Sequence, residues 1–241
     1  RFLRKKIIEP IADNSLFNSN FFGKKIKSYI TQANIPLPAR METYNFLHIN
    51  SPESVFTKEF LSQINQEKPI QLINTSYNRP DNASSLNRML YLDWKHTLAD
   101  NDLRKVNTMC ELAGVDVSYP MLSPEMIELS CQIPSKLKLT PYKLRYLYKK
   151  AMNGFLPDSI INKPKHGFGL PFGIWTKTDK NLQNIAYSTI DKLKTYNIFN
   201  EQFLEDTIKN HKTVHASYYG ELIWILMILG LWLENHSKRP K

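Results

Sequence analysis

The stretch Leu222–Leu233, with the sequence LIWILMILGLWL, is the only long apolar run in the chain. A segment that is apolar on every side is typical of a helix buried on all faces in a protein core. Because a helix needs about 20 apolar residues to cross a bilayer, this run of 12 residues is too short to span a membrane. We therefore expect a fully buried core helix over 216–235, and neither a transmembrane segment nor a membrane partner.

Signals that begin and end helices recur on the N-terminal side of this run. Residues 51–53 and 123–125 both read Ser-Pro-Glu, which combines an N-cap, a first-position proline and a first-turn acid. A further helix is expected to begin at 140–141, Thr-Pro, and to end at 153–154, Asn-Gly. The expected fold is mainly α, in one compact unit, with other helices over 14–33, 84–99, 180–194, 201–211 and 216–235 and loops near 66–82 and 156–175.

The composition is that of a folded domain with an excess of basic residues. The 241 residues are 42% hydrophobic, and 32 Lys and Arg against 22 Asp and Glu give a net charge of +10. Cys110 and Cys131 are the only cysteines, which excludes a disulfide framework and favours the reducing cytoplasm. The opening RFLRKKIIEP has no apolar core of a signal peptide and begins with Arg1, so we expect a fragment of a longer protein.

Positive charge is concentrated over 136–165, where eight basic residues accompany one acid, Asp158. Such a field attracts phosphate, either of a nucleic-acid backbone or of a nucleotide's polyphosphate. The alternative is that the lysines of the helix expected over 141–152 form only a solvated face. The residues alone leave both interpretations open.

Lys165 belongs to a separate feature, the loop Pro164–Gly173 with the sequence PKHGFGLPFG. Three of the chain's eight glycines fall in this loop, and a glycine such as Gly167 lets the backbone approach a ligand closely. A lysine on a loop stiffened by prolines suits phosphate oxygens, and His166 is a second candidate contact. A structural turn with an ordinary histidine is the alternative.

Asp116 is a further candidate, since it lies in the short, mostly apolar stretch 113–117. A carboxylate is costly to bury there without a partner, which favours an acid that faces the site near Lys165. A turn or capping carboxylate explains it equally well. No cluster of His, Cys, Asp and Glu has metal-ligand spacing, so no metal ligands are predicted.

Four segments follow a known family pattern. Residues 161–171, INKPKHGFGLP, with Trp175 are similar to R-P-K-x-G-F-G-x-P-x-x-x-W, and residues 146–157 to Y-L-L-R-R-A-L followed by L-P. Residues 114–122, GVDVSYPML, are similar to G-x-E-x-R-x-P-x-L. With the closing LIWILMILGLWLE, these segments resemble the glutamine-hydrolysing asparagine synthetases, over the whole chain and most specifically from about 105 to 175.

The resemblance implies an ATP-dependent amide-forming ligase that acts in two steps. ATP adenylates the carboxylate of aspartate or a related small molecule with release of pyrophosphate, and ammonia then attacks the acyl-adenylate. Lys165 matches the family lysine that stabilises the departing pyrophosphate, and Asp116 matches a glutamate suited to accept a proton. We expect Lys165, His166, Arg145 and Gly167 to contact ATP, with Mg²⁺ implied as its ion.

The resemblance also implies that residues 1–241 are the helical C-terminal part of a PP-loop synthetase domain, of the adenine-nucleotide-α-hydrolase type. The pyrophosphate loop Ser-Gly-Gly-x-Asp-Ser, its parallel sheet, the acidic Mg²⁺ segment and the glutaminase cysteine are not found in this sequence. A glutaminase domain or subunit would supply ammonia, and a homodimer is compatible with the family. We expect the fragment to be inactive alone.

Several charged positions depart from the family pattern. Asp116 is one methylene shorter than glutamate, Ser118 replaces an arginine, and Asn107 and Thr108 replace an Asp-Arg pair. Arg145 stands where the family has lysine. The alternative function is therefore a degenerate, non-catalytic homologue that acts as a binding or scaffold module. A nucleic-acid binder unrelated to the family is the least favoured hypothesis.

Overall fold

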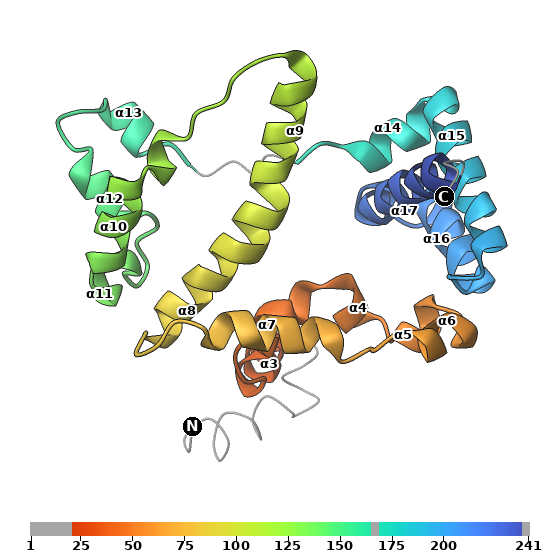
Figure 1. Ribbon diagram of the computed structural model, residues 1–241, viewed down its shortest axis with the longest axis horizontal. Helices are drawn as coiled ribbons and strands as arrows, with labels where there is room; N and C mark the ends of the chain where they lie inside the picture. The colour runs from red at the N-terminus through yellow and green to blue at the C-terminus, as the bar shows by residue number, and fades with distance from the viewer. Residues whose placement is uncertain (1–20, 165–168, 238–241) are drawn as a thin grey trace. The chain divides into compact units, whose positions relative to one another are not determined.

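The computed structural model describes residues 21–164 and 169–237 (Figure 1). Helices and their connections make up this part of the chain, and no β-strand is found in it. Within the same ranges, strand-like pairing is limited to three isolated bridges, of which that between Phe56 and Phe199 joins the most distant segments. The mainly α fold expected from the sequence is confirmed.

The chain divides into two compact units, where the sequence led us to expect one. The first unit comprises Arg1–Met41 and Pro69–His166, and the second comprises Glu42–Lys68 and Gly167–Lys241. Each unit is built from two separate stretches of sequence. Local helix signals carry no information about such long-range grouping, which is why they did not predict it.

One long helical rod runs through the first unit. It consists of α8 (Ser85–Leu92), the π-helical segment η3 (Asp93–Asp102) and α9 (Leu103–Ala113), which follow one another without a break (Figure 1). Gly114 ends the rod as a C-cap in the left-handed conformation, with φ of 65°. The other helices of this unit are α3 (Phe21–Asn34), η4 (Pro120–Leu122), α10 (Pro124–Gln132), α11 (Ser135–Lys138), α12 (Tyr146–Ala151), α13 (Asp158–Ile161) and, from its second residue on, α7 (Lys68–Asn78). The helix η2 (Ala39–Tyr44) crosses the boundary between the units.

The sequence predicted one helix of this unit, α10, and missed another, α7. α10 begins as expected, because the Ser123 hydroxyl accepts a hydrogen bond of 3.3 Å from the Met126 amide. α7, however, occupies the region near 66–82 where we expected a loop. Its less exposed face consists of Ile70, Ile73 and Tyr77. This i, i+3, i+7 spacing is a helix signal that the surrounding polar residues obscure.

The helix expected to begin at 51–53 is interrupted in the second unit. α5 covers only Pro52–Val55, and α6 (Lys58–Gln63) begins after Thr57. Between the two helices, the Thr57 amide donates a hydrogen bond of 3.0 Å to the Ile198 carbonyl. This long-range pairing satisfies a backbone donor and overrides the local helix signal.

The second unit contains the main apolar core. α17 (Ala216–Ser237) packs against α14 (Phe172–Thr178), α15 (Lys180–Lys192) and α16 (Glu201–Thr213), which surround it in Figure 1. The unit also contains α4 (Phe46–Ile49) and η5 (Leu193–Tyr196). The core consists of Val55, Ala186, Ile190, Leu193, Phe199, Leu204, Ile223, Leu226 and Met227.

α17 confirms the helix expected over 216–235, but the expectation of complete burial is wrong. Ile223 and Met227 are buried on its core face, whereas Ile225 and Trp232 are each 53% exposed. The helix is apolar on all sides, but the second unit covers only one of them.

By length and composition alone, α17 is the one helix in the described part of the chain that could cross a membrane. The argument from a 12-residue run was wrong, because flanking residues extend the helix to 22 residues. On one side, however, α17 packs closely against neighbouring helices of the second unit. A methyl group on Gly220 would overlap Gly173 of α14, and Glu234 forms an ion pair of 3.0 Å with Lys192 of α15.

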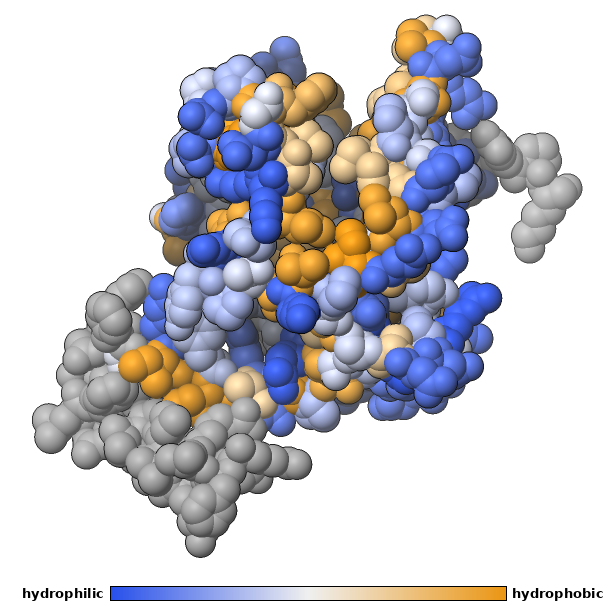
Figure 2. Space-filling view, turned by 90° about the vertical axis from the view of Figure 1, so that its left-hand side faces the viewer, coloured by the Kyte–Doolittle hydropathy of each residue, from blue (hydrophilic) through white to orange (hydrophobic). Residues whose placement is uncertain are grey.

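The first unit leaves much apolar surface exposed. Of the buried hydrophobic side chains among the described residues, only Tyr77 and Leu92 belong to it. Leu112 and Phe155, by contrast, are 76% and 79% exposed. Figure 2 shows apolar residues exposed on the side that it presents. Exposure on this scale is typical of a surface that further protein covers.

Candidate functional site

Two basic pockets flank the short helix α12. The first has a volume of about 370 Å³ and is lined by Arg145, Tyr148, Lys149, Leu156, Ile160, Ile161, Lys163 and Pro164. Three of these side chains are cationic, and no acid lines the pocket among the residues that the structure describes. A concave site with three positive charges and no negative charge suits an anion with several oxygens, such as a polyphosphate.

The second pocket lies against the same helix and has a volume of about 550 Å³. It is lined by Tyr142, Lys143, Leu144, Tyr146, Lys149, Lys150, Asn153, Ile161 and Asn162. Lys149 and Ile161 line both pockets. The Lys143 ammonium lies 5.2 Å from the centre of the Tyr146 ring, a cation–π contact that restrains this lysine beside the helix.

The turn before α12 positions Arg145. The helix start expected at 140–141 is wrong, because Thr140 pairs with Lys143 in a tight bridge and α12 begins only after Arg145. Arg145 itself has φ of 54° and ψ of 34°, a left-handed conformation that few non-glycine residues adopt. The expected end is confirmed, since Gly154 has φ of 80° just beyond the helix.

Three of the predicted site residues, Lys165, His166 and Gly167, lie outside the described residues. Their roles therefore stay predictions. Arg145 lines the first basic pocket, and Lys163 of the same pocket precedes Lys165 by two positions. Lys149 lines both pockets.

Asp116 is not among the described residues that line either basic pocket. It follows the C-cap Gly114, and both it and its neighbours Val115 and Val117 are exposed. The argument that a buried carboxylate needs a partner therefore does not apply here. Its role as a proton acceptor stays a prediction.

A buried polar network holds the C-terminal end of the loop that carries Lys165. His211 of α16 is fully buried, and its Nε2–H donates a hydrogen bond of 2.9 Å to the Gly173 carbonyl. Because a carbonyl only accepts, this bond leaves Nδ1 of the neutral ring to accept from the Tyr187 hydroxyl over 2.8 Å. Burial lowers the pKa of His211, which favours this neutral form.

The sequence analysis missed this network, although a signal for it was present. His211 lies four positions after Thr207 and seven after Leu204, so all three fall on one face of a helix, and all three are buried. A polar side chain on such a face needs a hydrogen-bond partner inside the protein. That partner, Gly173, is remote in sequence and could not be deduced from spacing.

Both pockets are thus basic and lie on a helical scaffold, and comparisons with known proteins give the family of the chain. The asparagine synthase family profile matches residues 16–234. The chain belongs to this family of ATP-dependent amidoligases, which confirms the resemblance found in the sequence and fits a helical portion of a synthetase. No solved structure matches the chain.

Curated relatives have low identity to this chain. Asparagine synthetase [glutamine-hydrolyzing] 1 of Bacillus subtilis (strain 168) is 24% identical over 191 residues, which cover 78% of this chain and 29% of that protein. A protein of Mycobacterium tuberculosis (strain ATCC 25618 / H37Rv), provisionally named a glutamine-hydrolysing asparagine synthetase, is 22% identical over 64% of this chain and 24% of its own length. The chain therefore spans less than a third of the length of either relative.

Proposed function

We propose that residues 1–241 form the helical C-terminal part of an ATP-dependent amide-forming ligase, and that the pocket of Arg145, Lys149 and Lys163 receives the nucleotide's polyphosphate. The observation that carries this proposal is the pocket itself, which no acid lines among the described residues and whose lining includes Pro164, the residue before Lys165. Membership of the asparagine synthase family supports the reaction class. The charge of the pocket and the family of the chain are thus both compatible with this assignment.

The chemistry of adenylation explains why these cations are needed. A carboxylate oxygen of the substrate attacks the α-phosphorus of ATP, and the bond between the α-phosphorus and the bridging oxygen breaks. The departing pyrophosphate takes that electron pair, so negative charge grows on oxygens at the pocket. Lys165 and the cations of the pocket lower the barrier by stabilising this charge in place. His166 and the Gly167 backbone would add hydrogen bonds to the same oxygens.

Amide formation needs a different group. Ammonia attacks the acyl carbon, AMP leaves, and the nitrogen must lose a proton. Asp116 is the side chain that we assign as acceptor, since it matches the family glutamate. The acceptor acid is aspartate or a related small carboxylate, and a glutaminase domain or subunit supplies the ammonia.

We propose that Mg²⁺ is held outside the described residues. Among the described residues, no group of three or more His, Cys, Asp or Glu side chains could hold a metal ion. This part of the chain does not fit the ion, and we derive no step through it. Since the chain also spans less than a third of its curated relatives, we propose that it is inactive alone and that the rest of a cytoplasmic synthetase covers its apolar surface.

A degenerate, non-catalytic homologue is the second candidate function. One observation favours it: the Tyr119 hydroxyl donates a hydrogen bond of 2.7 Å to Oδ1 of Asn107, where the family pattern has an aspartate. A position that carries a charge in the family thus has a structural contact here. Such a module would bind a nucleotide or a partner without turnover.

ATP–pyrophosphate exchange in the protein that carries this chain distinguishes the two functions. We expect Lys149→Ala and Lys163→Ala to reduce exchange at least tenfold, and Lys165→Ala to abolish it. Lys136→Ala removes a charge from the same basic segment, but outside both pockets, and should leave the rate unchanged. Full exchange in the Lys165→Ala protein would disprove the assigned role, and absence of exchange in the unaltered protein would favour the module.

A further inference from the structure

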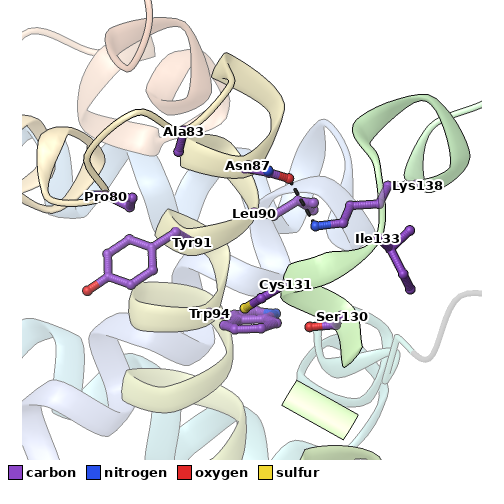
Figure 3. A pocket seen from close by; sticks show the side chains of 10 residues that line it. All are labelled: Pro80, Ala83, Asn87, Leu90, Tyr91, Trp94, Ser130, Cys131, Ile133 and Lys138. Atoms are coloured by element: carbon purple, nitrogen blue, oxygen red, sulfur yellow. Dashed lines mark hydrogen bonds between the residues drawn. The ribbon is translucent and has the colours of Figure 1, made fainter. Parts of the chain in front are cut away.

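The first unit contains a third pocket, of about 340 Å³, between the helical rod and the α10–α11 segment. Figure 3 shows its lining, which consists of Pro80, Ala83, Asn87, Leu90, Tyr91, Trp94, Ser130, Cys131, Ile133 and Lys138. Most of these side chains are apolar or aromatic. A concave apolar site of this size with a few polar groups is the usual form of a small-molecule site.

Two polar contacts brace one end of this pocket. The hydroxyl oxygens of Ser84 and Ser135 lie 2.8 Å apart, and the Lys138 ammonium donates a hydrogen bond of 3.0 Å to Oδ1 of Asn87 (Figure 3). Ser84, the N-cap of α8, lies three positions before Asn87, and Ser135 lies three positions before Lys138 in α11, so each pair faces one way. The contacts therefore fix the distance between the two walls and keep Lys138 at the pocket.

The charge of the third pocket is positive. Lys138 is its one cation and no acid lines it, within the described part of the chain. An ammonium group has three donor hydrogens, and Asn87 takes one of them, so donors remain for a ligand. A bound carboxylate would accept from a lysine that is already oriented, while an apolar body would lie against Leu90 and Trp94.

The backbone under Trp94 is also unusual. Trp94 belongs to η3, a π-helical stretch of 10 residues within the rod. π-helical turns are rare and recur at functional sites. Here the stretch contributes the largest aromatic ring of the pocket.

We infer that this pocket is a binding site for an amphipathic monocarboxylate, with the carboxylate on Lys138 and an aromatic or aliphatic body between α8–η3 and α10. The pocket shares no lining residue with the two basic pockets beside α12. The inference therefore stands or falls independently of the proposed ligase activity.

Cys131 gives a local readout, because it lines the pocket and is exposed. In a Cys110→Ser background it is the only thiol of this chain. The probe is 3-phenylpropionate, and its neutral amide and the cation 3-phenylpropylammonium are the matched ligands. We expect 3-phenylpropionate to slow the alkylation of Cys131 by iodoacetamide in a saturable way. Half-maximal protection should need an at least tenfold lower concentration of the carboxylate than of the amide. The ammonium compound should give no protection.

Variants of Lys138 test whether this lysine causes the preference for the carboxylate. Lys138→Gln should weaken protection by 3-phenylpropionate about tenfold, as expected for loss of one charge-assisted hydrogen bond. Lys138→Arg should retain the preference for the carboxylate, which guards against a folding defect in the glutamine variant. Lys136→Gln, on the same short helix but outside the pocket, should have no effect. Absence of saturable protection, equal protection by all three ligands, or equal behaviour of the Lys136 and Lys138 variants would overturn the inference.

Discussion

His211 and Gly173 are joined by a hydrogen bond of 2.9 Å in which a buried imidazole holds the backbone of the first turn of α14. The Tyr187 hydroxyl completes the network at the other ring nitrogen, and the Lys212 ammonium lies 4.4 Å from the centre of the Tyr187 ring. Three helices of the second unit, α14, α15 and α16, are therefore connected through one side chain. This network anchors the end of the loop Pro164–Gly173, whose other end borders the first basic pocket.

Stability should depend on the protonation state of His211. Its pKa is lowered from the ordinary value of 6.5, chiefly by burial, so the unfolded chain binds a proton more readily than the folded one. Above pH 6.5 both states are neutral and there is no effect. As the pH falls through 6.5 towards the lowered folded pKa, the free energy of unfolding should fall. Urea titrations between pH 8 and pH 5 measure this slope.

A His211→Asn variant tests the assignment. It has no imidazole, so it should be less stable at pH 8 and should lose that part of the pH dependence. An unchanged slope in the variant would mean that other groups cause it.

Gly173 and Gly220 form a contact without room for side chains. A Cβ on Gly173 would overlap the Ala216 carbonyl, and a Cβ on Gly220 would overlap the backbone of Gly173. Each Gly→Ala variant should therefore destabilise the second unit by about 1–3 kcal/mol, the usual range for overpacking.

Gly169→Ala is the matched control in the same loop. A Cβ at Gly169 would meet no described atom within 4 Å, so the midpoint of urea unfolding should change little. Equal loss of stability in the Gly169 and Gly173 variants would contradict the close packing of α14 on α17.

The N-cap serine of α10, which makes a capping hydrogen bond, can be compared with that of α5, which makes none. Ser123→Ala removes the oxygen that accepts from the Met126 amide, at a cost of about 1 kcal/mol in the free energy of unfolding. Ser123→Asp keeps an acceptor and should retain stability. Ser51→Ala should have little effect, because the Ser51 side chain makes no capping hydrogen bond. A stable Ser123→Ala protein would show that the cap is dispensable.

These examples show how far the sequence predicts the fold. The serine at position 123 and the glycine at position 154 act locally, and the structure confirms both signals. The signal at position 51 also begins a helix, but that helix ends at Val55, because the chain next to it pairs with a segment about 140 residues away. Local patterns encode helix ends, whereas tertiary pairing decides which of those ends are used.

The candidate site likewise has features that the sequence predicts and features that only the folded chain shows. Charge density left open an anion site or a solvated face over 136–165, and the structure forms two pockets there that no acid lines among the described residues. The roles of Lys165 and Asp116 came from resemblance, and their geometry stays untested. The pocket of Trp94 and Lys138 left no sequence signal, since its two walls meet only in the folded unit.

Asp116 should separate the two chemical steps in the protein that carries this chain. If the carboxylate accepts the proton lost by ammonia, Asp116→Asn removes a base that typically contributes a factor of 10²–10⁴ to a rate. ATP–pyrophosphate exchange, which reports only adenylation, should remain near the unaltered rate. Amide formation, followed by release of AMP with ammonia as the nitrogen source, should slow by at least tenfold.

Asp116→Glu provides the comparison, because it restores the side chain of the family pattern. If reach limits the natural aspartate, this variant should form amide at least as fast as the unaltered protein. Equal losses in exchange and in amide formation on Asp116→Asn would instead assign Asp116 to substrate binding or to the structure of the segment after α9. The ratio of the two rates therefore decides the role, because a general loss of folded protein lowers both rates by the same factor.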